Sequence, residues 1–334
     1  RACLTEQNHH GQSREDVFLC IPPLYHTGAK MHWFGSLVAG SKAVLLRGVK
    51  PEWILRAVTE EKCTIVWLLV PWGQDMLDAI ESGREDLSKY RLDQWRLMHM
   101  GAQPVPPSLI KRWHKIFPHH QYDTNYGLSE SIGPGCVHLG VENIHKVGAI
   151  GVPGYGWETR IVDDRGVDVT KGDVGELIVR GNGVMQCYYK NPEASAEVLK
   201  DGWLFTGDMA RVDEDGYLYI TGRTKEIIVL QSGENVSPAE LEVKFYGIDA
   251  VQDCVVYDRV VNGAQILVLE ILPRMSTVKA QGITDPAAHI RGEVAKINET
   301  LPPFERVQKV ILRDTDFPRT PAMKIDRKKA SNPQ

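Results

Sequence analysis

Two short segments bring together the residue types that suit a nucleotide. Tyr126-Gly127-Leu128-Ser129-Glu130 offers an aromatic ring, a glycine, a hydroxyl and a carboxylate within five residues. Such a set suits a ring stacked on a base, a hydroxyl on phosphate and a carboxylate on Mg²⁺. The small residues of Gly101-Ala102-Gln103 would let backbone amides approach the edge of a base. Taken alone, each segment is better explained as an ordinary turn or strand-to-helix loop.

Two further segments carry charged residues that a fold alone would not require. Asp208, in Thr206-Gly207-Asp208, would place a carboxylate against ribose hydroxyls, and Arg223 follows fifteen residues later as a second contact. Lys324 lies in a polar, basic tail. The alternative interpretation is an Asp that caps a turn, an Arg in a surface ion pair that contributes little energy, and a solvated lysine.

These segments lie between strands and helices that alternate along the chain. Between residues 17 and 124, apolar runs such as Cys63–Val70 alternate with amphipathic stretches such as Pro107–Phe117. This alternation predicts an α/β fold with a parallel sheet covered on both faces. Ligands collect at the carboxyl ends of strands in such sheets, which is where Gly101 and Tyr126 fall.

After about Lys146 the pattern changes to short strands joined by Gly/Asp turns, which predicts a small antiparallel β subdomain. The turn at Asp213–Gly216 closes one hairpin. Ser237, followed by Pro238 and Glu240, has the pattern of a capping box at the start of a helix. The remainder of the chain predicts a compact α+β unit. We therefore expect two domains, residues 1–222 and 223–334.

Composition narrows the classes of protein. The chain has 334 residues and a net charge of −4, which does not indicate nucleic-acid binding. Its longest apolar run is far shorter than the roughly 20 residues of a membrane span. Six cysteines without a CxxC pair indicate reduced thiols in a cytoplasmic protein. The pairs His9-His10 and His119-His120 are expected at the surface, so no zinc site is predicted. Residues 1–16 show no obvious helix or strand.

Eight motifs occur along the chain in a defined order: PPLYHTG, GAQP, YGLSE, GELIVRG, TGD, GRTKEII, GENVSPAELE and PRTPAMKIDR. In this order they closely resemble the adenylate-forming superfamily, which includes acyl- and aryl-CoA synthetases, firefly-type luciferases and peptide-synthetase adenylation domains. The resemblance runs from Asp16 to Lys329. It implies part of a large N-terminal α/β domain, followed by a mobile C-terminal α+β domain that rotates between two half-reactions.

The resemblance also implies roles for residues around a nucleotide. Tyr126 would stack on adenine, Ser129 would contact phosphate, and Glu130 would hold Mg²⁺. Asp208 and Arg223 would bind the ribose hydroxyls. The full set of positions that the resemblance assigns to the nucleotide is Gly101, Ala102, Gln103, Tyr126, Gly127, Ser129, Asp208 and Arg223.

Other positions are implied to act in the two half-reactions. Lys324 would bridge the substrate carboxylate and the α-phosphate, and His26 would sit at the acyl pocket near the thiol entry. Lys225 would be the hinge. Gly233 and Glu234 would line the channel for the pantetheine arm of CoA. The implied reaction uses ATP, Mg²⁺ and CoA to convert a carboxylic acid, fatty or otherwise hydrophobic, into its CoA thioester.

One family feature is absent from residues 1–16, namely the Ser/Thr/Gly-rich phosphate loop that should precede PPLYHTG. Such loops grip phosphates through backbone N–H groups and a lysine. We therefore expect this chain to be the later part of a longer protein and to be inactive alone. The alternatives are a peptide-synthetase-type adenylation domain, an acyl-AMP ligase, or a non-catalytic nucleotide-binding remnant. A homodimer is also kept open.

Overall fold

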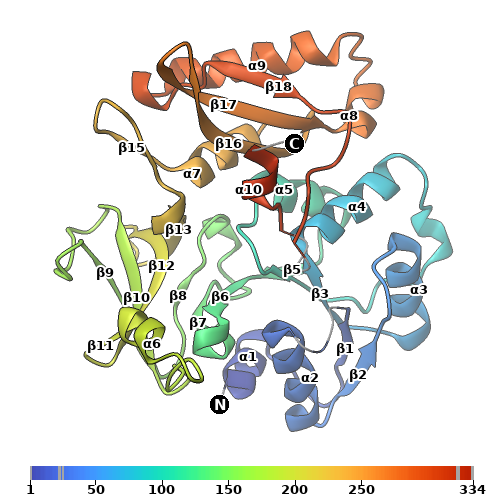
Figure 1. Ribbon diagram of the computed structural model, residues 1–334. Coiled ribbons are helices and arrows are strands. Elements are labelled where there is room, and N and C mark those ends of the chain that lie inside the picture. The colour runs from blue at the N-terminus through green and yellow to red at the C-terminus, as the bar shows by residue number, and fades with distance from the viewer. Residues whose placement is uncertain (1, 22–23, 25, 321–323, 332–334) are drawn as a thin grey trace. The chain divides into compact units, whose positions relative to one another are not determined.

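The computed structural model describes residues 2–21, 24, 26–320 and 324–331. The chain divides into two units, Arg1–Ile220 and Thr221–Gln334, which are treated separately below. Figure 1 shows the elements of both. Three residues of the PPLYHTG motif (Pro22, Pro23 and Tyr25) and Pro321, Ala322 and Met323 of the tail motif lie outside the described residues.

A parallel five-stranded sheet forms the centre of the first unit, as the alternating pattern predicted. Its order is β2-β1-β3-β4-β5, and every neighbouring pair is parallel. All five residues of β3 and all five of β4 are buried, because helices cover both faces of such a sheet. The strands are β1 (Val17–Cys20), β2 (Lys42–Leu45), β3 (Ile65–Leu69), β4 (Leu97–Gly101) and β5 (Gln121–Asp123).

The order of the strands determines where the helices lie. From β1 the chain crosses to β2 in one direction, and then crosses back to β3, β4 and β5 in the other. Because such crossovers are right-handed, α2 belongs on one face of the sheet and α3, α4 and α5 on the opposite face. Figure 1 shows α2 beside α1, away from α3 and α4. The helices are α2 (Thr27–Ala39), α3 (Pro51–Glu61), α4 (Val70–Glu81) and α5 (Pro107–Ile116).

Residues 2–10 form helix α1 (Ala2–His10), an element that the sequence did not predict. Its buried positions are all polar, Glu6 and His10 among them, so it has no apolar stripe for periodicity to detect. The expected surface position was also wrong for His10 and His120, which are 2% and 3% exposed. His10 is buried because α1 packs on α2 and β7, and the His120 ring accepts a hydrogen bond from Trp113.

Two antiparallel sheets complete the first unit. One has the order β11-β12-β10-β9, with β13 also pairing with β12, and the other has the order β6-β7-β8. The predicted hairpin turn is present, because Gly216 takes a φ of +87° and its N–H donates to the Asp213 carbonyl. The elements are β6 (Asn125–Leu128), β7 (Gly133–His138), β8 (Val152–Pro153), β9 (Trp157–Val162), β10 (Gly175–Gly181), α6 (Pro192–Val198), β11 (Leu199–Lys200), β12 (Trp203–Val212) and β13 (Leu218–Arg223).

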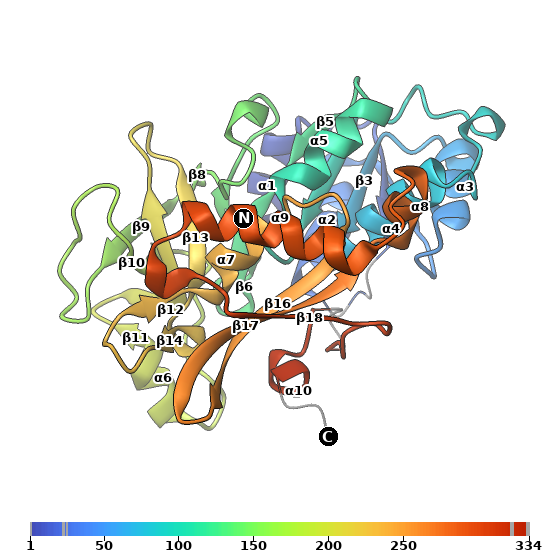
Figure 2. The same cartoon turned by 90° about the horizontal axis from the view of Figure 1, so that it is seen from above.

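The second unit is built on the sheet β16-β17-β18, whose first pair is antiparallel and whose second is parallel. Alternate residues of β16 pack on opposite faces. Val256 belongs to a core with α7 and α9, and Val255 to a smaller cluster with Ala330 of α10. Figure 2 shows α9 along the sheet. The elements are β14 (Ile228–Val229), β15 (Asn235–Val236), α7 (Pro238–Phe245), β16 (Val251–Val261), β17 (Ala264–Pro273), α8 (Met275–Ala280), α9 (Pro286–Thr300), β18 (Lys309–Leu312) and α10 (Arg327–Ser331).

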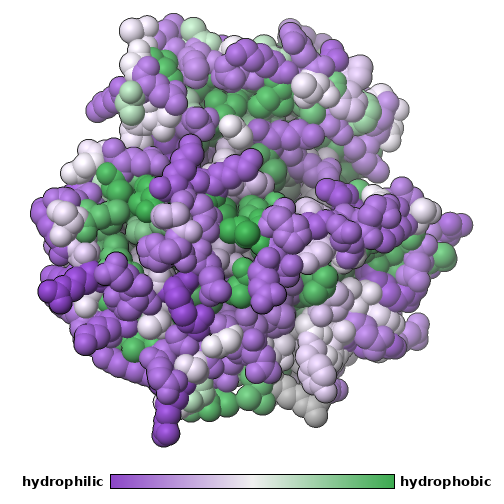
Figure 3. Space-filling model, turned by 180° about the vertical axis from the view of Figure 1, so that it is seen from behind, coloured by the Kyte–Doolittle hydropathy of each residue, from purple (hydrophilic) through white to green (hydrophobic). Residues whose placement is uncertain are grey.

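The surface is mainly polar on the face that Figure 3 displays, with hydrophobic residues in scattered patches. Among the described residues, none of the helices has both the length and the apolar character needed to cross a bilayer. All six cysteines are free thiols, in agreement with the expectation from their spacing.

Candidate functional site

Tyr126 and Asp208, predicted from two separate motifs, meet in the first unit. The Tyr126 hydroxyl on β6 donates a 2.6 Å hydrogen bond to Asp208 Oδ2 on β12, across a sequence separation of 82 residues. Asp208 is 4% exposed. Burial, and then the charge of Asp208, raise the pKa of the Tyr126 hydroxyl well above its ordinary value. The phenol therefore stays protonated at neutral pH and donates to the carboxylate.

The carboxylate of Asp208 is presented by a bulge in β12. The register between β10 and β12 shifts between Glu176 and Ile178, which leaves extra residues on β12 at Thr206–Asp208. Gly207 takes a φ of +72°, a region that favours glycine, and its N–H donates to Glu176 Oε1 at 2.9 Å. Thr206 Oγ1 accepts from the Asp208 N–H at 3.1 Å. The TGD motif thus forms a bulge that orients the Asp208 side chain toward Tyr126.

Glu130 has a partner that the sequence did not reveal. Tyr188, which follows β10, donates its hydroxyl to Glu130 Oε1 at 2.8 Å. The Met185 N–H donates to the Glu130 carbonyl at 2.7 Å, so the segment after β10 lies against YGLSE. Nothing in the spacing of Tyr188 indicated this contact, because the two residues are 58 positions apart.

The PPLYHTG and YGLSE motifs also lie side by side. Thr27 Oγ1 lies 3.5 Å from Ser129 Oγ, and the N–H of Lys30 donates to the His26 carbonyl as helix α2 begins. A Cβ placed on Gly133 would lie 2.6 Å from the Thr27 methyl group, which is one reason for a glycine there. The structure therefore brings His26, at the start of α2, to the same region as Ser129 and Glu130.

The Gly101–Gln103 segment leaves the sheet at the end of β4. Gly101 is buried, whereas Ala102 is exposed and takes a φ of +69°, which is strained for a residue with a Cβ. A side chain on Gly101 would come within 3.8 Å of Trp67 Nε1 and Asn125 Oδ1. Trp67 Nε1 is a buried donor without a hydrogen-bond partner in the described part of the chain, which the sequence did not predict.

The remaining predicted residues belong to the second unit. Arg223, Lys225, Glu234 and Lys324 are all exposed. Gly233 takes a φ of +97° in the turn between β14 and β15, where its N–H donates to the Leu230 carbonyl. The turn itself therefore favours a glycine at this position, whatever role Gly233 has toward CoA.

Two ion pairs hold the tail on either side of Lys324. Arg319 Nη2 lies 2.6 Å from Asp253 Oδ2, and Arg327 forms a bidentate pair with Glu242 of α7. Asp253 and Glu242 are each 6% exposed. The Thr320 N–H donates to the Lys324 carbonyl at 2.8 Å. Described residues on both sides of Lys324 are therefore held by ion pairs, whereas the sequence context of this lysine is equally typical of a solvated tail.

Comparisons with known proteins show the family to which the chain is related. Family models described as "AMP-binding enzyme" and "AMP-binding enzyme C-terminal domain" match residues 1–189 and 225–333. The chain is 34% identical over 240 residues to a feruloyl-CoA synthase of an Amycolatopsis species, covering 71% of this chain and 47% of the relative. It is 31% identical over 331 residues to a 4-coumarate–CoA ligase-like protein of Oryza sativa subsp. japonica, covering 97% and 56%.

The fold is also that of solved structures. An amide bond synthetase from Marinactinospora thermotolerans superposes with a TM-score of 0.83 at 24% identity, covering 98% of this chain and 64% of that chain. The mixed α/β fold with a separate C-terminal unit is thereby confirmed. The chain spans about half the length of the curated relatives that it matches.

Proposed function

Because this chain belongs to the AMP-binding enzyme family, we propose that it is part of an ATP-dependent acid–thiol ligase. In the first half-reaction a carboxylate oxygen attacks the α-phosphorus of ATP, and the bond to the β-phosphate breaks to release pyrophosphate. In the second, the sulfur of CoA attacks the acyl carbonyl, the bond to AMP breaks, and the thiol proton is released. The products are the acyl-CoA and AMP.

The observation that carries this proposal is the hydrogen bond between Tyr126 and Asp208. This hydrogen bond joins the motif that the family resemblance assigns to adenine with the motif that it assigns to ribose. We propose that Tyr126 stacks on adenine with Gly127 beneath it, that Gly101, Ala102 and Gln103 line the adenine pocket, and that Asp208 binds a ribose hydroxyl. The buried carboxylate supports this role because it accepts strongly from hydroxyl donors.

Mg²⁺ fits the chemistry of Glu130. Hard divalent cations prefer carboxylate oxygens, and Glu130 is half-buried with one oxygen oriented by the Tyr188 hydroxyl. We propose that Glu130 holds Mg²⁺, which neutralises charge on the phosphates when it is bound. Ser129, exposed beside it, would donate its hydroxyl to a phosphate oxygen.

We propose roles for the remaining residues, all of which except His26 lie in the second unit. Lys324 would bridge the substrate carboxylate and the α-phosphate, offsetting the charge that builds on the phosphoryl oxygens. Arg223 would bind ribose, and Lys225 would be the pivot between the half-reactions. His26 would lie at the acyl pocket, and Gly233 and Glu234 would border the CoA channel. The ion pairs of Arg319 and Arg327 support the role of Lys324, because a charge between two held residues is positioned better than a charge in a solvated tail.

The names of the relatives favour one class of acid. The two relatives compared above are named for feruloyl-CoA and 4-coumarate, and the acyl group in each name carries an aromatic ring. We therefore propose a hydrophobic acid as substrate and place aryl acids ahead of the fatty acids expected from the sequence.

We also propose a cytoplasmic location, which the free cysteines support. A homodimer is a further proposal, and light scattering would test it.

The test is acid-dependent exchange of labelled pyrophosphate into ATP by the full-length protein that contains this chain. We expect exchange with at least one aryl or fatty acid, and thioester formation when CoA is added. Lys324→Ala should suppress exchange strongly and leave thiolation of a synthetic acyl-AMP nearly intact, whereas the exposed lysine variant Lys329→Ala should match the parent. No exchange across aromatic, aliphatic and amino acids would overturn the proposal in favour of a nucleotide-binding remnant.

The acceptor separates the remaining alternatives. A peptide-synthetase-type domain would exchange with amino acids and would not use free CoA, whereas an acyl-AMP ligase would form the adenylate but pass it to a carrier protein. Release of AMP in the presence of the acid and CoA is therefore the decisive measurement.

A further inference from the structure

A group of buried histidines and carboxylates lies in the first unit, apart from the residues assigned to the nucleotide. Helix α1 contributes Glu6 and His10, and the parallel sheet contributes His99 from β4 and Asp123 from β5. Each of these four is at most 2% exposed. His32 of α2 and His138 of β7, also buried, border the group.

The four side chains point their polar atoms at one place. His10 Nε2 lies 2.8 Å from His99 Nδ1, 3.3 Å from Asp123 Oδ2 and 3.4 Å from Glu6 Oε1. His99 Nδ1 lies 3.9 Å from Asp123 Oδ2 and 3.8 Å from Glu6 Oε1. Ligands about 2.0–2.2 Å from a tetrahedral Zn²⁺ lie roughly 3.3–3.6 Å from one another. The separations of 3.3, 3.4, 3.8 and 3.9 Å lie near this range, and the two imidazoles, hydrogen-bonded at 2.8 Å, would move apart slightly to bind an ion.

The group is also short of hydrogen bonds. Asp123 Oδ2, Glu6 Oε2, His99 Nε2 and His10 Nδ1 are buried without a hydrogen-bond partner among the described residues. Buried polar groups are nearly always satisfied, and each unsatisfied one costs about 1–3 kcal/mol. Of the atoms that converge, His10 Nε2 and His99 Nδ1 share a hydrogen bond and Glu6 Oε1 accepts from Asn125 Nδ2, whereas Asp123 Oδ2 has no hydrogen-bond partner among the described residues. A fully buried carboxylate oxygen left in this state beside two imidazoles indicates a missing ligand.

We propose that His10 Nε2, His99 Nδ1, Asp123 Oδ2 and Glu6 Oε1 bind a divalent transition-metal ion, Zn²⁺ by its ligand chemistry. Imidazole nitrogens select Zn²⁺ over Mg²⁺ and Ca²⁺, which prefer oxygen. Glu6 and His10 are four residues apart on α1 and therefore share one face of the helix. Asn125 Nδ2 donates to Glu6 Oε1 at 2.5 Å, an outer contact of the kind that orients metal-binding carboxylates.

His99 is the residue on which the site depends. A second set of three ligand atoms within 4.8 Å of one another consists of Glu6, His32 and His99. His99 is common to both sets, so its removal tests the site whichever carboxylate and second histidine complete it.

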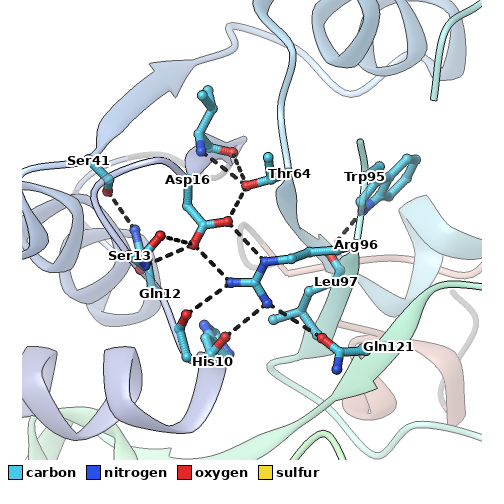
Figure 4. Close-up of polar contacts among 12 residues, drawn as sticks. His10, Gln12, Ser13, Asp16, Ser41, Thr64, Trp95, Arg96, Leu97 and Gln121 are labelled. Carbon is cyan, nitrogen blue, oxygen red and sulfur yellow. Dashed lines mark hydrogen bonds and ion pairs between the residues drawn. The ribbon is translucent and has the colours of Figure 1, made fainter. Parts of the chain in front are cut away.

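The helix that carries two of the ligands is held against the sheet independently of any ion. Figure 4 shows Arg96, which directly precedes β4, donating from Nη1 to the His10 carbonyl at 3.0 Å. Its Nη2 also donates to the Gly11 carbonyl at 3.3 Å. The same guanidinium forms a bidentate pair with Asp16. The end of α1 is therefore fixed next to His99, and the site is preorganised.

A metal here would position the proposed nucleotide site rather than react. His99 precedes Gly101 by two residues on β4, and Asp123 precedes Tyr126 by three. An ion bound to α1, β4 and β5 would tie the strand ends that carry those residues to one point. The site is distinct from the Mg²⁺ proposed at Glu130, which is half-exposed and uses oxygen ligands.

The test measures metal binding without ATP, acid or CoA, so that its outcome is independent of the proposed function. The chain is stripped with a chelator, confirmed as folded by circular dichroism, and titrated with Co²⁺ and then with Zn²⁺ against a chromophoric chelator. We expect one ion per chain, an intense visible band of tetrahedral Co²⁺, its displacement by Zn²⁺, and a rise in the unfolding temperature with Zn²⁺.

The matched variants are His99→Gln and His120→Gln, each of which replaces one buried imidazole of the same unit. His99→Gln should lower Zn²⁺ affinity at least a hundredfold, and His120→Gln should leave it unchanged. If His99→Gln does not fold, Asp123→Asn and the Co²⁺ spectrum of the parent chain carry the test. A folded parent chain with less than one tightly bound ion and no tetrahedral Co²⁺ spectrum, or equal affinity in His99→Gln, would overturn the proposal.

Discussion

The ion pair between Asp16 and Arg96 makes a quantitative prediction about the first unit. Arg96 Nε and Nη2 donate to the two Asp16 oxygens at 2.9 and 3.0 Å. Thr64 Oγ1 donates to Oδ1 at 2.6 Å, and the Ser13 N–H donates to Oδ2 at 2.8 Å. The perturbation is Asp16→Asn, which keeps the shape of the side chain but removes its charge and turns an NH₂ group toward the Arg96 donors.

The magnitude follows from the pKa of Asp16. Burial would raise this pKa, but the hydrogen bonds from Arg96, Thr64 and Ser13 outweigh it and lower the pKa from 3.8 to about 2. A depression of almost two units corresponds to about 2.5 kcal/mol at neutral pH, at roughly 1.4 kcal/mol per unit. The side chain of Arg96 is 33% exposed, and the resulting solvent screening reduces the expected loss to about 2 kcal/mol.

The sign of the pH dependence is fixed by the direction of that shift. Because the folded pKa lies below the unfolded one, the stabilisation is complete above about pH 5 and is lost as the pH falls from about 4 to about 2. Urea unfolding of the parent chain and of Asp16→Asn should therefore differ at pH 7 and converge as the pH falls to about 2. Asp75→Asn, which breaks an exposed pair with Arg84, is the control and should change little.

A difference below about 0.5 kcal/mol at pH 7 would refute the reasoning, because the coupling would then have no more effect than an exposed pair. A large difference that persists unchanged at about pH 2 would also contradict it. In that case the loss would come from packing of the Asn side chain and not from the charge of Asp16.

Two further variants test contacts of the proposed active site. Tyr126→Phe keeps the ring but removes the hydroxyl that donates to the buried Asp208 carboxylate. Hydrogen bonds to charged groups contribute about 1.5–3 kcal/mol. We therefore expect about tenfold weaker ATP binding, measured by calorimetry of the full-length protein. Unchanged ATP affinity would contradict the proposal that Asp208 binds the ribose. Arg327→Met leaves the Glu242 carboxylate buried without its charge partner and should destabilise the second unit by about 3 kcal/mol in urea. A loss of adenylation that exceeds the loss of folded protein would show that the pair also positions Lys324.

Most of the fold could be predicted from local patterns. The helices α3 and α5 begin at prolines and have apolar faces, and the apolar run of β3 is long enough only for a buried strand. The N-cap of α7 at Ser237, whose Oγ accepts from the Glu240 N–H, was also predicted. These features are encoded within about a dozen residues, so sequence periodicity and end signals are sufficient to detect them.

The elements that were missed are those without a local signal. Helix α1 buries Glu6 and His10 instead of an apolar stripe, so its sequence is that of an exposed segment. Tyr126 was expected after a strand and lies within one, because β6 pairs with β7 through a bulge that the short motif does not specify. Only the presence of neighbouring elements made these residues helical or extended.

For the candidate site too, the sequence identified some residues, and the structure alone revealed their contacts. Motif order was enough to select Tyr126 and Asp208, and the structure added the hydrogen bond that joins them and the partner of Glu130, Tyr188. The loop that carries Lys324 depends on Arg327 reaching Glu242, a separation of 85 residues. Contacts at such separations are set by the packing of whole elements, and one sequence does not contain them as a pattern.

By itself, the sequence determined which chemical groups the protein carries, in what order, and which short segments turn, cap or extend. The tertiary structure alone decided which of those groups share a place. His10, His99 and Asp123 were surface or strand residues in the sequence, and the packing of α1 on the sheet buried them within 4 Å of one another. Local conformation is set by neighbours along the chain, whereas burial and charge are set by neighbours in space, which is why the fold was predicted and this buried cluster was not.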